Sequence, residues 1–141
     1  MKQLTPYLFF SGQCEEALKF YKDCLGGEII KIQRFKDSPV NVPDEYKSKI
    51  MHAEFKVDEL FFMASDGMPD KPEVSGDNIF LSMQFTSKEE QERVFKALTK
   101  GGTILMPLEK TFWGSTFGQL KDRFGINWML KCSLQDEKYG Y

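Results

Sequence analysis

The stretch CEEALKFYKDCLGGEI, residues 14–29, has a counterpart in SKEEQERVFKALTKGGTI, residues 87–104. In each stretch apolar residues recur at helical intervals until a Gly-Gly pair, and a strand-like segment follows. The two Gly-Gly pairs begin at 26 and 101, so they lie 75 positions apart (101 − 26) in a chain of 141 residues. A repeat of roughly half the chain predicts an internal duplication.

Both predicted helices have start signals. Glu15 and Glu16 stand in the first turn of the first helix, where the helix dipole favours carboxylates. Ser87 and Glu90 form a capping box at the start of the second helix. The apolar face of the first helix comprises Cys14, Ala17, Leu18, Tyr21, Cys24 and Leu25, and that of the second comprises Val94, Phe95 and Leu98.

Strand-like segments flank each helix, at 4–10, 28–35, 49–57 and 60–65 in the first half and at 79–85, 103–108, 116–120 and 126–132 in the second. The polar, proline-containing segment 36–48 has too weak a pattern for a prediction. The predicted fold class is therefore α+β, with two βαβββ modules at about 1–70 and about 76–135 in a single domain, 1–141. Each sheet would bury one face under its helix and turn the other toward its twin, which gives an open barrel-like sheet around a cleft.

The segment FWGSTFGQLKDRFGINWM, residues 112–129, contains both tryptophans of the chain. A turn signal at Asp122–Gly125 divides it into two strand-like halves and predicts a hairpin. Strand alternation predicts that Trp128, together with Phe124, is structural. Phe112, Trp113 and Phe117 are predicted to form part of the cleft wall, since Trp113 stands at a glycine-bounded turn where no periodic pattern buries it.

Composition narrows the class of protein. A net charge of −2 with interspersed signs argues against nucleic acid as a partner. The apolar runs are too short to span a membrane, and the N-terminus has no secretion signal. Three cysteines without a CxxC spacing are typical of a reducing compartment, so we expect a cytoplasmic protein.

Five stretches together resemble the PhnB-like branch of the vicinal oxygen chelate superfamily: TPYLFF, CEEALKFYKDCLGGEI, MHAEF, MPLEKTFWG and FGQLKDRFGINWM. This superfamily includes glyoxalase I, bleomycin resistance proteins and extradiol dioxygenases, and the likeness covers nearly the whole chain. A methyltransferase label often accompanies the branch. The sequence gives it no support, because no glycine-rich loop joins a strand to a helix and the strands and helices do not alternate as in a doubly wound sheet.

The resemblance also implies where a metal would bind. Metal-dependent members place His or Glu ligands on the first and last strands of each module. The matching positions here are Pro6, Met63, Phe80 and Met129, and none has a nitrogen or oxygen donor in its side chain. His52 is the only histidine and cannot hold a divalent metal alone. We therefore expect no metal and no cofactor.

Alternation along the strands then predicts which side chains share the cleft with these positions. Phe61 shares a face with Met63, Ser82 and Gln84 share one with Phe80, and Asn127 and Lys131 share one with Met129. Apolar walls with a few polar groups are typical of a small-molecule pocket. The predicted ligand-binding residues are Phe61, Met63, Ser82, Gln84, Phe112, Trp113, Phe117, Asn127, Met129 and Lys131.

Two functions remain open at this point. The first is a metal-free protein that binds a small molecule between the modules, as bleomycin-resistance-like proteins do. The second is a cofactorless or substrate-metal isomerase or lyase with His52 and Glu54 as acid and base, since both lie on the face of their strand opposite Met51, Ala53 and Phe55. In either case we expect a homodimer, because modules of this superfamily often pair across subunits and open strand edges need cover.

Overall fold

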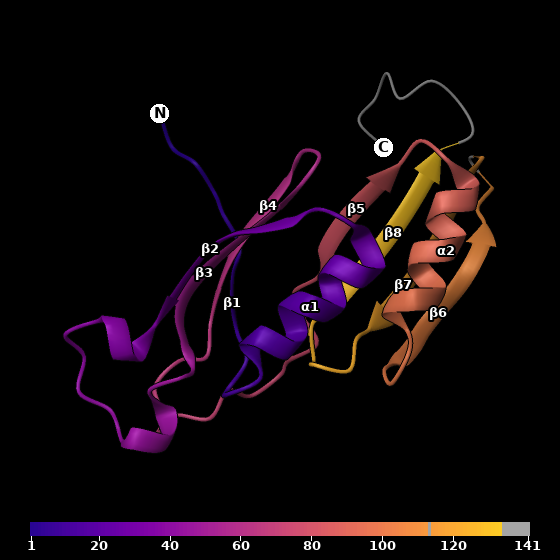
Figure 1. Cartoon of the computed structure of the whole chain (residues 1–141). Coiled ribbons are helices and arrows are strands. Elements are labelled where there is room, and N and C mark those ends of the chain that lie inside the picture. The colour runs from indigo at the N-terminus through magenta and orange to yellow at the C-terminus, as the bar shows by residue number, and fades with distance from the viewer. Residues whose placement is uncertain (113, 134–141) are drawn as a thin grey trace. The chain divides into compact units, whose positions relative to one another are not determined.

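The structure, a computed structural model, describes residues 1–112 and 114–133. The chain divides into two units, Met1–Val74 and Ser75–Tyr141. Within the described ranges each unit consists of one α-helix and an open four-stranded sheet, in the order β-α-β-β-β (Figure 1). The predicted α+β class and duplicated order are confirmed. No helix in these ranges is long and apolar enough to cross a membrane.

The first unit contains β1 (Tyr7–Phe9), α1 (Cys14–Leu25), β2 (Glu28–Arg34), β3 (Ile50–Val57) and β4 (Leu60–Ser65). Its strands lie in the order β1-β4-β3-β2; β1 is parallel to β4, and the other neighbours are antiparallel. Two short 3-10 helices, Phe35–Asp37 and Asp44–Tyr46, overlap the segment 36–48 for which the sequence predicted nothing.

The apolar stripe of α1 packs on its sheet as the spacing predicts. The ring of Tyr21 meets Phe62 of β4 edge-on, with centroids 5.9 Å apart. The buried residues of the helix are Cys14, Ala17, Leu18, Tyr21 and Cys24. Burial of a stripe of this kind, rather than helix propensity, supplies most of the stability of a short helix.

The second unit contains β5 (Leu81–Phe85), α2 (Lys88–Leu98), β6 (Thr103–Lys110), β7 (Ser115–Lys121) and β8 (Asn127–Ser133), with the strand order β5-β8-β7-β6. Here β5 is parallel to β8. Ser87 is the N-cap of α2, and its Oγ accepts a hydrogen bond from the Glu90 amide at 3.2 Å, as the capping box predicts. The buried face of α2 comprises Gln91, Val94, Phe95 and Leu98.

The repeated Gly-Gly pairs have one physical explanation in both units. The first glycine of each pair has a positive φ, 79° at Gly26 and 75° at Gly101, which residues with a side chain rarely adopt. The second passes close to the neighbouring strand: a Cβ on Gly27 would lie 2.5 Å from the Lys56 carbonyl oxygen, and one on Gly102 would collide with the Lys121 carbonyl. The duplication therefore preserves the turn that leads each helix into its sheet.

A buried aspartate organises the predicted hairpin between β7 and β8. Asp122 Oδ1 accepts hydrogen bonds from the backbone amides of Phe124 and Ile126, at 2.8 and 3.1 Å. Its Oδ2 accepts a third, at 2.8 Å, from Nε1 of Trp128. Trp128 is buried, which confirms that it is structural.

A second buried aspartate joins three elements of the first unit. Asp66 follows β4 directly, and its Oδ1 accepts a hydrogen bond from the Cys14 amide at 2.7 Å. Its Oδ2 accepts from the Ile50 amide at the same distance. Gln13, the N-cap residue of α1, makes no side-chain cap bond, so Asp66 caps this helix from a distant part of the chain.

Replacing Asp66 should therefore destabilise the protein strongly. Asp66→Ala leaves two backbone amides without their acceptors in a buried site, and we expect a loss of roughly 3 kcal/mol in the free energy of unfolding, measured by urea denaturation. Asp66→Asn keeps one acceptor and should lose less. Asp70→Ala, an exposed change in the following loop, should stay within about 0.5 kcal/mol of the wild type. Equal effects of Asp66→Ala and Asp70→Ala would contradict the capping role.

Candidate functional site

Strand alternation gives the first sheet two chemically different faces. The face under α1 is apolar and buried, and comprises Leu8, Ala53, Phe55, Phe62 and Ala64. We call the other side, which does not carry the helix of its own unit, the open face. Strands β1, β3 and β4 place Tyr7, Phe9, His52, Glu54, Phe61 and Met63 on it. By their pairing, Lys56 of β3 and Glu28, Lys31 and Gln33 of β2 lie on the same face.

The register of the strands brings these side chains into neighbouring rows. Met63 of β4 pairs with Tyr7 on one side and with Glu54 on the other, and paired residues project from the same face of a sheet. A bulge between β2 and β3 interrupts the alternation one residue before His52. Ile50 is therefore buried, whereas Met51 is only half-buried, unlike the alternation expected from the sequence.

A hydrogen-bonded chain of three side chains crosses this open face. The Tyr7 hydroxyl lies 2.8 Å from Nδ1 of His52, and Nε2 of His52 lies 3.0 Å from Oε2 of Glu54. The rings of Tyr7 and His52 also touch, with centroids 5.6 Å apart, and the ring of Phe9 stacks on that of Tyr7 at 5.0 Å. The structure thus brings together the two predicted acid/base candidates and adds a tyrosine.

Tyr7 was not among the site residues predicted from the sequence. The prediction named its neighbour Pro6 instead, as one of the four metal positions. The Tyr7 hydroxyl reaches His52 from β1 across the intervening β4, a contact that depends on a register no local pattern reveals. Burial raises the pKa of Tyr7 above its ordinary value, with smaller contributions from Cys14 and Glu54. The hydroxyl therefore keeps its proton at neutral pH, while the side chain stays 37% exposed.

The open face of the second sheet carries five of the other predicted side chains, Ser82, Gln84, Phe117, Met129 and Lys131. Lys131 of β8 pairs with Gln84 of β5 and with Phe117 of β7. One step along, Met129 pairs with Ser82 and Gln119. Lys131 is only 7% exposed, so its long side chain is buried on this face.

Three other predicted ligand-binding residues, Asn127, Phe112 and Trp113, are not part of these rows of paired side chains. The amide of Asn127 donates hydrogen bonds to the carbonyls of Gly76 and Ile79, both at 3.0 Å, and so holds the segment that leads into β5. Phe112 is 96% exposed. Trp113 lies outside the described residues. Roles for all three in ligand binding stay predictions, as does the cleft expected between the modules.

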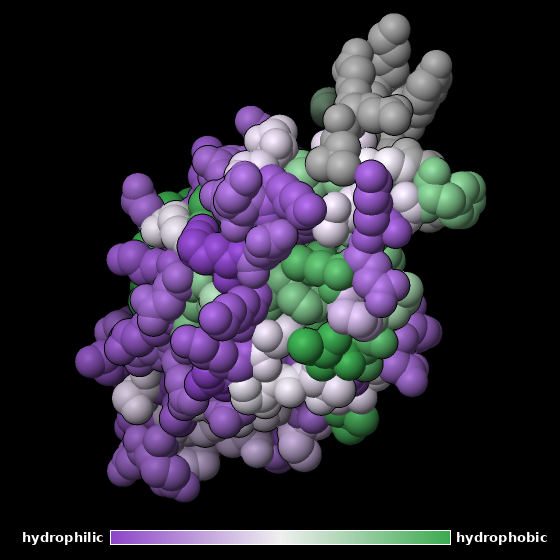
Figure 2. Space-filling model, turned by 90° about the vertical axis from the view of Figure 1, so that its right-hand side faces the viewer, coloured by the Kyte–Doolittle hydropathy of each residue, from purple (hydrophilic) through white to green (hydrophobic). Residues whose placement is uncertain are grey.

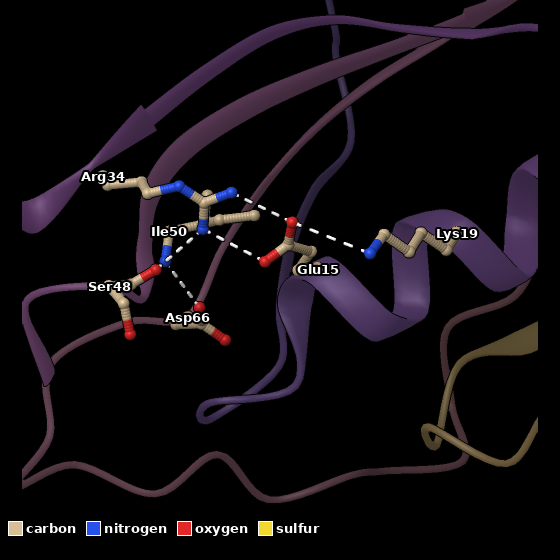
Figure 3. A network of polar contacts seen from close by, with 6 residues as sticks. All are labelled: Glu15, Lys19, Arg34, Ser48, Ile50 and Asp66. Atoms are coloured by element: carbon tan, nitrogen blue, oxygen red, sulfur yellow. Dashed lines mark hydrogen bonds and ion pairs between the residues drawn. The ribbon is translucent and has the colours of Figure 1, made fainter. Parts of the chain in front are cut away.

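A polar network at the start of α1 forms a small cavity of about 110 Å³ (Figure 3). Arg34 donates to both carboxylate oxygens of Glu15, at 3.1 and 2.9 Å, and to the Ser48 carbonyl at 2.7 Å. These hydrogen bonds hold the pKa of Glu15 below its ordinary value and raise that of Arg34. Pockets for drug-sized ligands are several times larger, and the charged groups here already bind one another, so this network is structural.

Comparison with known proteins places the chain in a family. Residues 2–131 match the family described as 3-demethylubiquinone-9 3-methyltransferase. The chain belongs to this family. It corresponds to the PhnB-like branch of the vicinal oxygen chelate superfamily, as the sequence motifs predict.

Several relatives of this PhnB-like protein extend over nearly its whole length. Protein PA1353 of Pseudomonas aeruginosa is 43% identical, with a TM-score of 0.84 over 94% of this chain and 98% of that one. The PhnB protein from Bacillus cereus is 29% identical, with a TM-score of 0.79 over 94% of this chain and all of the other. Protein YjdN of Escherichia coli K12 is 33% identical over 94% of this chain and 96% of its own length.

Likeness in fold alone extends to a glyoxalase/bleomycin resistance protein/dioxygenase family enzyme from Burkholderia phytofirmans PsJN. That enzyme is 15% identical, with a TM-score of 0.62 over 91% of this chain and 97% of its own.

The residues at the superfamily's metal positions do not fit a divalent cation. Pro6 and Phe80 have no side-chain donor, and Met63 and Met129 offer only soft thioethers. In residues 1–112 and 114–133 no three His, Cys, Asp or Glu side chains lie close enough together to hold a metal. His52 and Glu54 could supply two ligands, and His52 already bonds to Tyr7 through its other nitrogen.

We therefore expect the purified PhnB-like protein to contain well under one equivalent of zinc, nickel, manganese or iron, because too few nitrogen and oxygen donors converge at these positions. Elemental analysis after dialysis measures the metal content, and EDTA should leave the melting temperature unchanged. Near-stoichiometric metal that survives dialysis would contradict both the alignment of these four positions and the binding function proposed below.

Proposed function

We propose that this PhnB-like protein binds a small, partly apolar molecule without a bound metal, on the open face that carries Tyr7, His52 and Glu54. The observation behind the proposal is the hydrogen-bonded chain of these three side chains beside the apolar Phe9, Phe61 and Met63. Polar groups oriented by one another among apolar walls are typical of small-molecule sites, where they set the position of the ligand.

The apolar part of this site comes from three side chains around the polar chain. Phe9 extends the aromatic surface of Tyr7 and is exposed. Phe61 and Met63 lie beside them on β4 and are half-buried. A methionine adapts its shape to different ligands, and flat rings offer stacking surface to planar ones. Ligand contacts from Ser82, Gln84, Phe117, Met129 and Lys131 of the second unit stay predictions from the sequence.

The methyltransferase description of the family is not part of this proposal. Transfer of a methyl group needs a bound methyl donor, and S-adenosylmethionine is usually held by a glycine-rich loop between a strand and a helix. The turn between β1 and α1 has a single glycine, Gly12. The Cys14 amide at the start of α1 is already bonded to Asp66. These residues do not fit the donor.

Acid/base catalysis is the second candidate function. A specific observation favours it: His52 and Glu54 share a hydrogen bond of 3.0 Å and are both largely buried at the side chain. A histidine oriented by a carboxylate is a common general base, which would suit a cofactorless or substrate-metal isomerase or lyase. Turnover separates the two candidates, since a binding protein returns its ligand unchanged.

A screen of small aromatic and aliphatic metabolites by thermal shift tests the binding function. We expect hits to raise the melting temperature and to move the NMR signals of the open face around Met63. In His52→Ala the affinity for these hits should fall and lose its dependence on pH between about 5 and 8, the range in which histidines change charge. Glu59→Gln, a change at an exposed turn, should leave both unaltered. If His52→Ala binds every hit with the pH profile of the wild type, His52 has only a structural role.

We also propose that the protein forms a homodimer through exposed strand edges. Its cytoplasmic location stays a prediction from the sequence. Strand β6 is an edge of the second sheet, and its Ile104, Leu105 and Met106 are between 43% and 52% exposed. Figure 2 shows hydrophobic side chains gathered on the side of the molecule it faces, bordered by hydrophilic ones. An apolar, unpaired edge is a surface on which a second chain can pair.

Light scattering at micromolar concentration should therefore give the mass of two chains. Leu105→Glu places a charge in the proposed interface and should shift the protein toward the monomer. Ile79→Glu changes an equally apolar, exposed residue outside the strands and should not. A monomeric wild type would rule out the dimer.

A further inference from the structure

The Tyr7 hydroxyl is the exposed end of the hydrogen-bonded chain on the open face. His52 and Glu54 are about one fifth to one quarter exposed at the side chain, whereas Tyr7 is 37% exposed and belongs to the edge strand β1. Both ring nitrogens of His52 already make hydrogen bonds, Nδ1 with Tyr7 and Nε2 with Glu54. A ligand on this face can therefore reach the polar end of the chain through the Tyr7 oxygen.

The direction of the two hydrogen bonds follows from the chemistry of the groups. A carboxylate can only accept, so the hydrogen between His52 and Glu54 belongs to Nε2. In a neutral imidazole the other nitrogen, Nδ1, then has a lone pair and no hydrogen. The bond of 2.8 Å between Nδ1 and Tyr7 is consequently donated by the Tyr7 hydroxyl. Its hydrogen is engaged, and its oxygen keeps a lone pair that can accept a hydrogen bond from a ligand.

Protonation of His52 reverses this arrangement. Both ring nitrogens of an imidazolium are donors, so Nδ1 then donates to the Tyr7 oxygen. The hydroxyl hydrogen of Tyr7 is released and can point to a ligand. We infer that Tyr7 is a ligand-contacting, specificity-determining residue, an acceptor for hydroxyl-bearing ligands when His52 is neutral and a donor to carbonyl-bearing ligands when His52 is charged. This inference rests on the proposed binding function and adds the chemical class that each state selects.

The other ionisable groups on this face do not duplicate the role of His52. Strand β3 contributes Glu54 and Lys56, and β2 contributes Glu28 and Lys31, which pair with Lys56 and Glu54 respectively. Strand β4, between Tyr7 and His52, contains no ionisable residue, since its sequence is LFFMAS. In the part of the chain that the structure describes, the Tyr7 hydroxyl has one side-chain hydrogen-bond partner, His52. A change in the hydrogen-bond direction of Tyr7 therefore reports on His52.

NMR of the imidazole ring tests the first step without any ligand. His52 is the only histidine of the chain, so its two ring nitrogens are assigned unambiguously in ¹⁵N-labelled protein. Above the titration of His52, which the same spectra measure, we expect the tautomer with hydrogen on Nε2. A dominant tautomer with hydrogen on Nδ1 would overturn the inference, because Tyr7 could not then donate to that nitrogen.

A matched pair of probes tests the second step. Phenol can donate a hydrogen bond, whereas acetophenone, of similar size and also aromatic, can only accept one. We expect phenol to bind more tightly above the titration of His52 than below it, and acetophenone to show the opposite trend, each by roughly three- to tenfold, the size of one net hydrogen bond. Dissociation constants come from the shifts of open-face signals at two pH values.

Tyr7→Phe removes the hydroxyl and keeps the ring, so both probes should still bind but without either pH trend. Tyr46→Phe is the control, because that hydroxyl donates to the backbone carbonyls of Asp66 and Gly67 and not to the site; it should keep both trends. A pH trend that survives Tyr7→Phe would overturn the inference and place His52 itself against the ligand. Probes that bind wild type equally at both pH values would overturn the inference alone. Probes that shift no open-face signal would overturn the proposed binding function as well.

Discussion

The first unit depends on the buried carboxylate of Asp66. It accepts hydrogen bonds from the amides that begin α1 and β3, two elements 36 positions apart (Ile50 minus Cys14). A carboxylate in a buried place is costly unless its oxygens are bonded, and these backbone amides would themselves be unsatisfied without it. The first residue of β3 is therefore held in place, and His52 and Glu54 follow two and four positions later. The geometry of the candidate site begins at this structural contact.

An ion pair with two hydrogen bonds, between Arg34 and Glu15, also joins the end of β2 to the start of α1. Because its folded-state pKa is lowered, Glu15 contributes stability above its unfolded-state pKa, and this contribution is lost as the pH falls through the folded value. The pair is partly exposed, so solvent weakens it relative to the Asp66 contacts. Its two hydrogen bonds link the last residue of β2 to the first turn of α1.

The second unit keeps the order of elements but uses different polar contacts. Helix α2 begins with its own cap at Ser87, so no distant aspartate is needed there. Its buried aspartate, Asp122, instead organises a hairpin and the indole of Trp128. Gln91 of α2 donates to the carbonyls of Thr116 and Leu130, a contact that links the helix to β7 and β8. The duplicated halves thus share turns and apolar faces, while the His-Glu pair belongs to the first alone.

Local patterns were enough to predict the helices, the strands and the Gly-Gly turns, because each depends on neighbours within a few positions. The residues of the candidate site could be predicted from the sequence only in part. His52 and Glu54 share a strand, so alternation placed them together. Tyr7 comes from the edge strand on the far side of β4, and only the parallel register of β1 with β4 brings it within reach. The bulge beside Met51 likewise depends on a partner outside its own strand, because it arises where β3 pairs with β2.

The parallel pairing of β1 with β4 also has a consequence for folding. Tyr7 pairs with Met63, so this contact closes a loop of 56 positions (63 − 7), whereas β3 and β4 are joined by a tight turn. Closing a loop of that length costs conformational entropy before the new contacts compensate for it, and contacts of large sequence separation slow folding. If β1 paired with β4 before α1 had packed, the whole loop between them would have to close at once. A polypeptide in which α1, β2, β3 and β4 have already packed still lacks the Tyr7–His52 hydrogen bond. The candidate site is complete only when the N-terminal strand β1 docks beside β4.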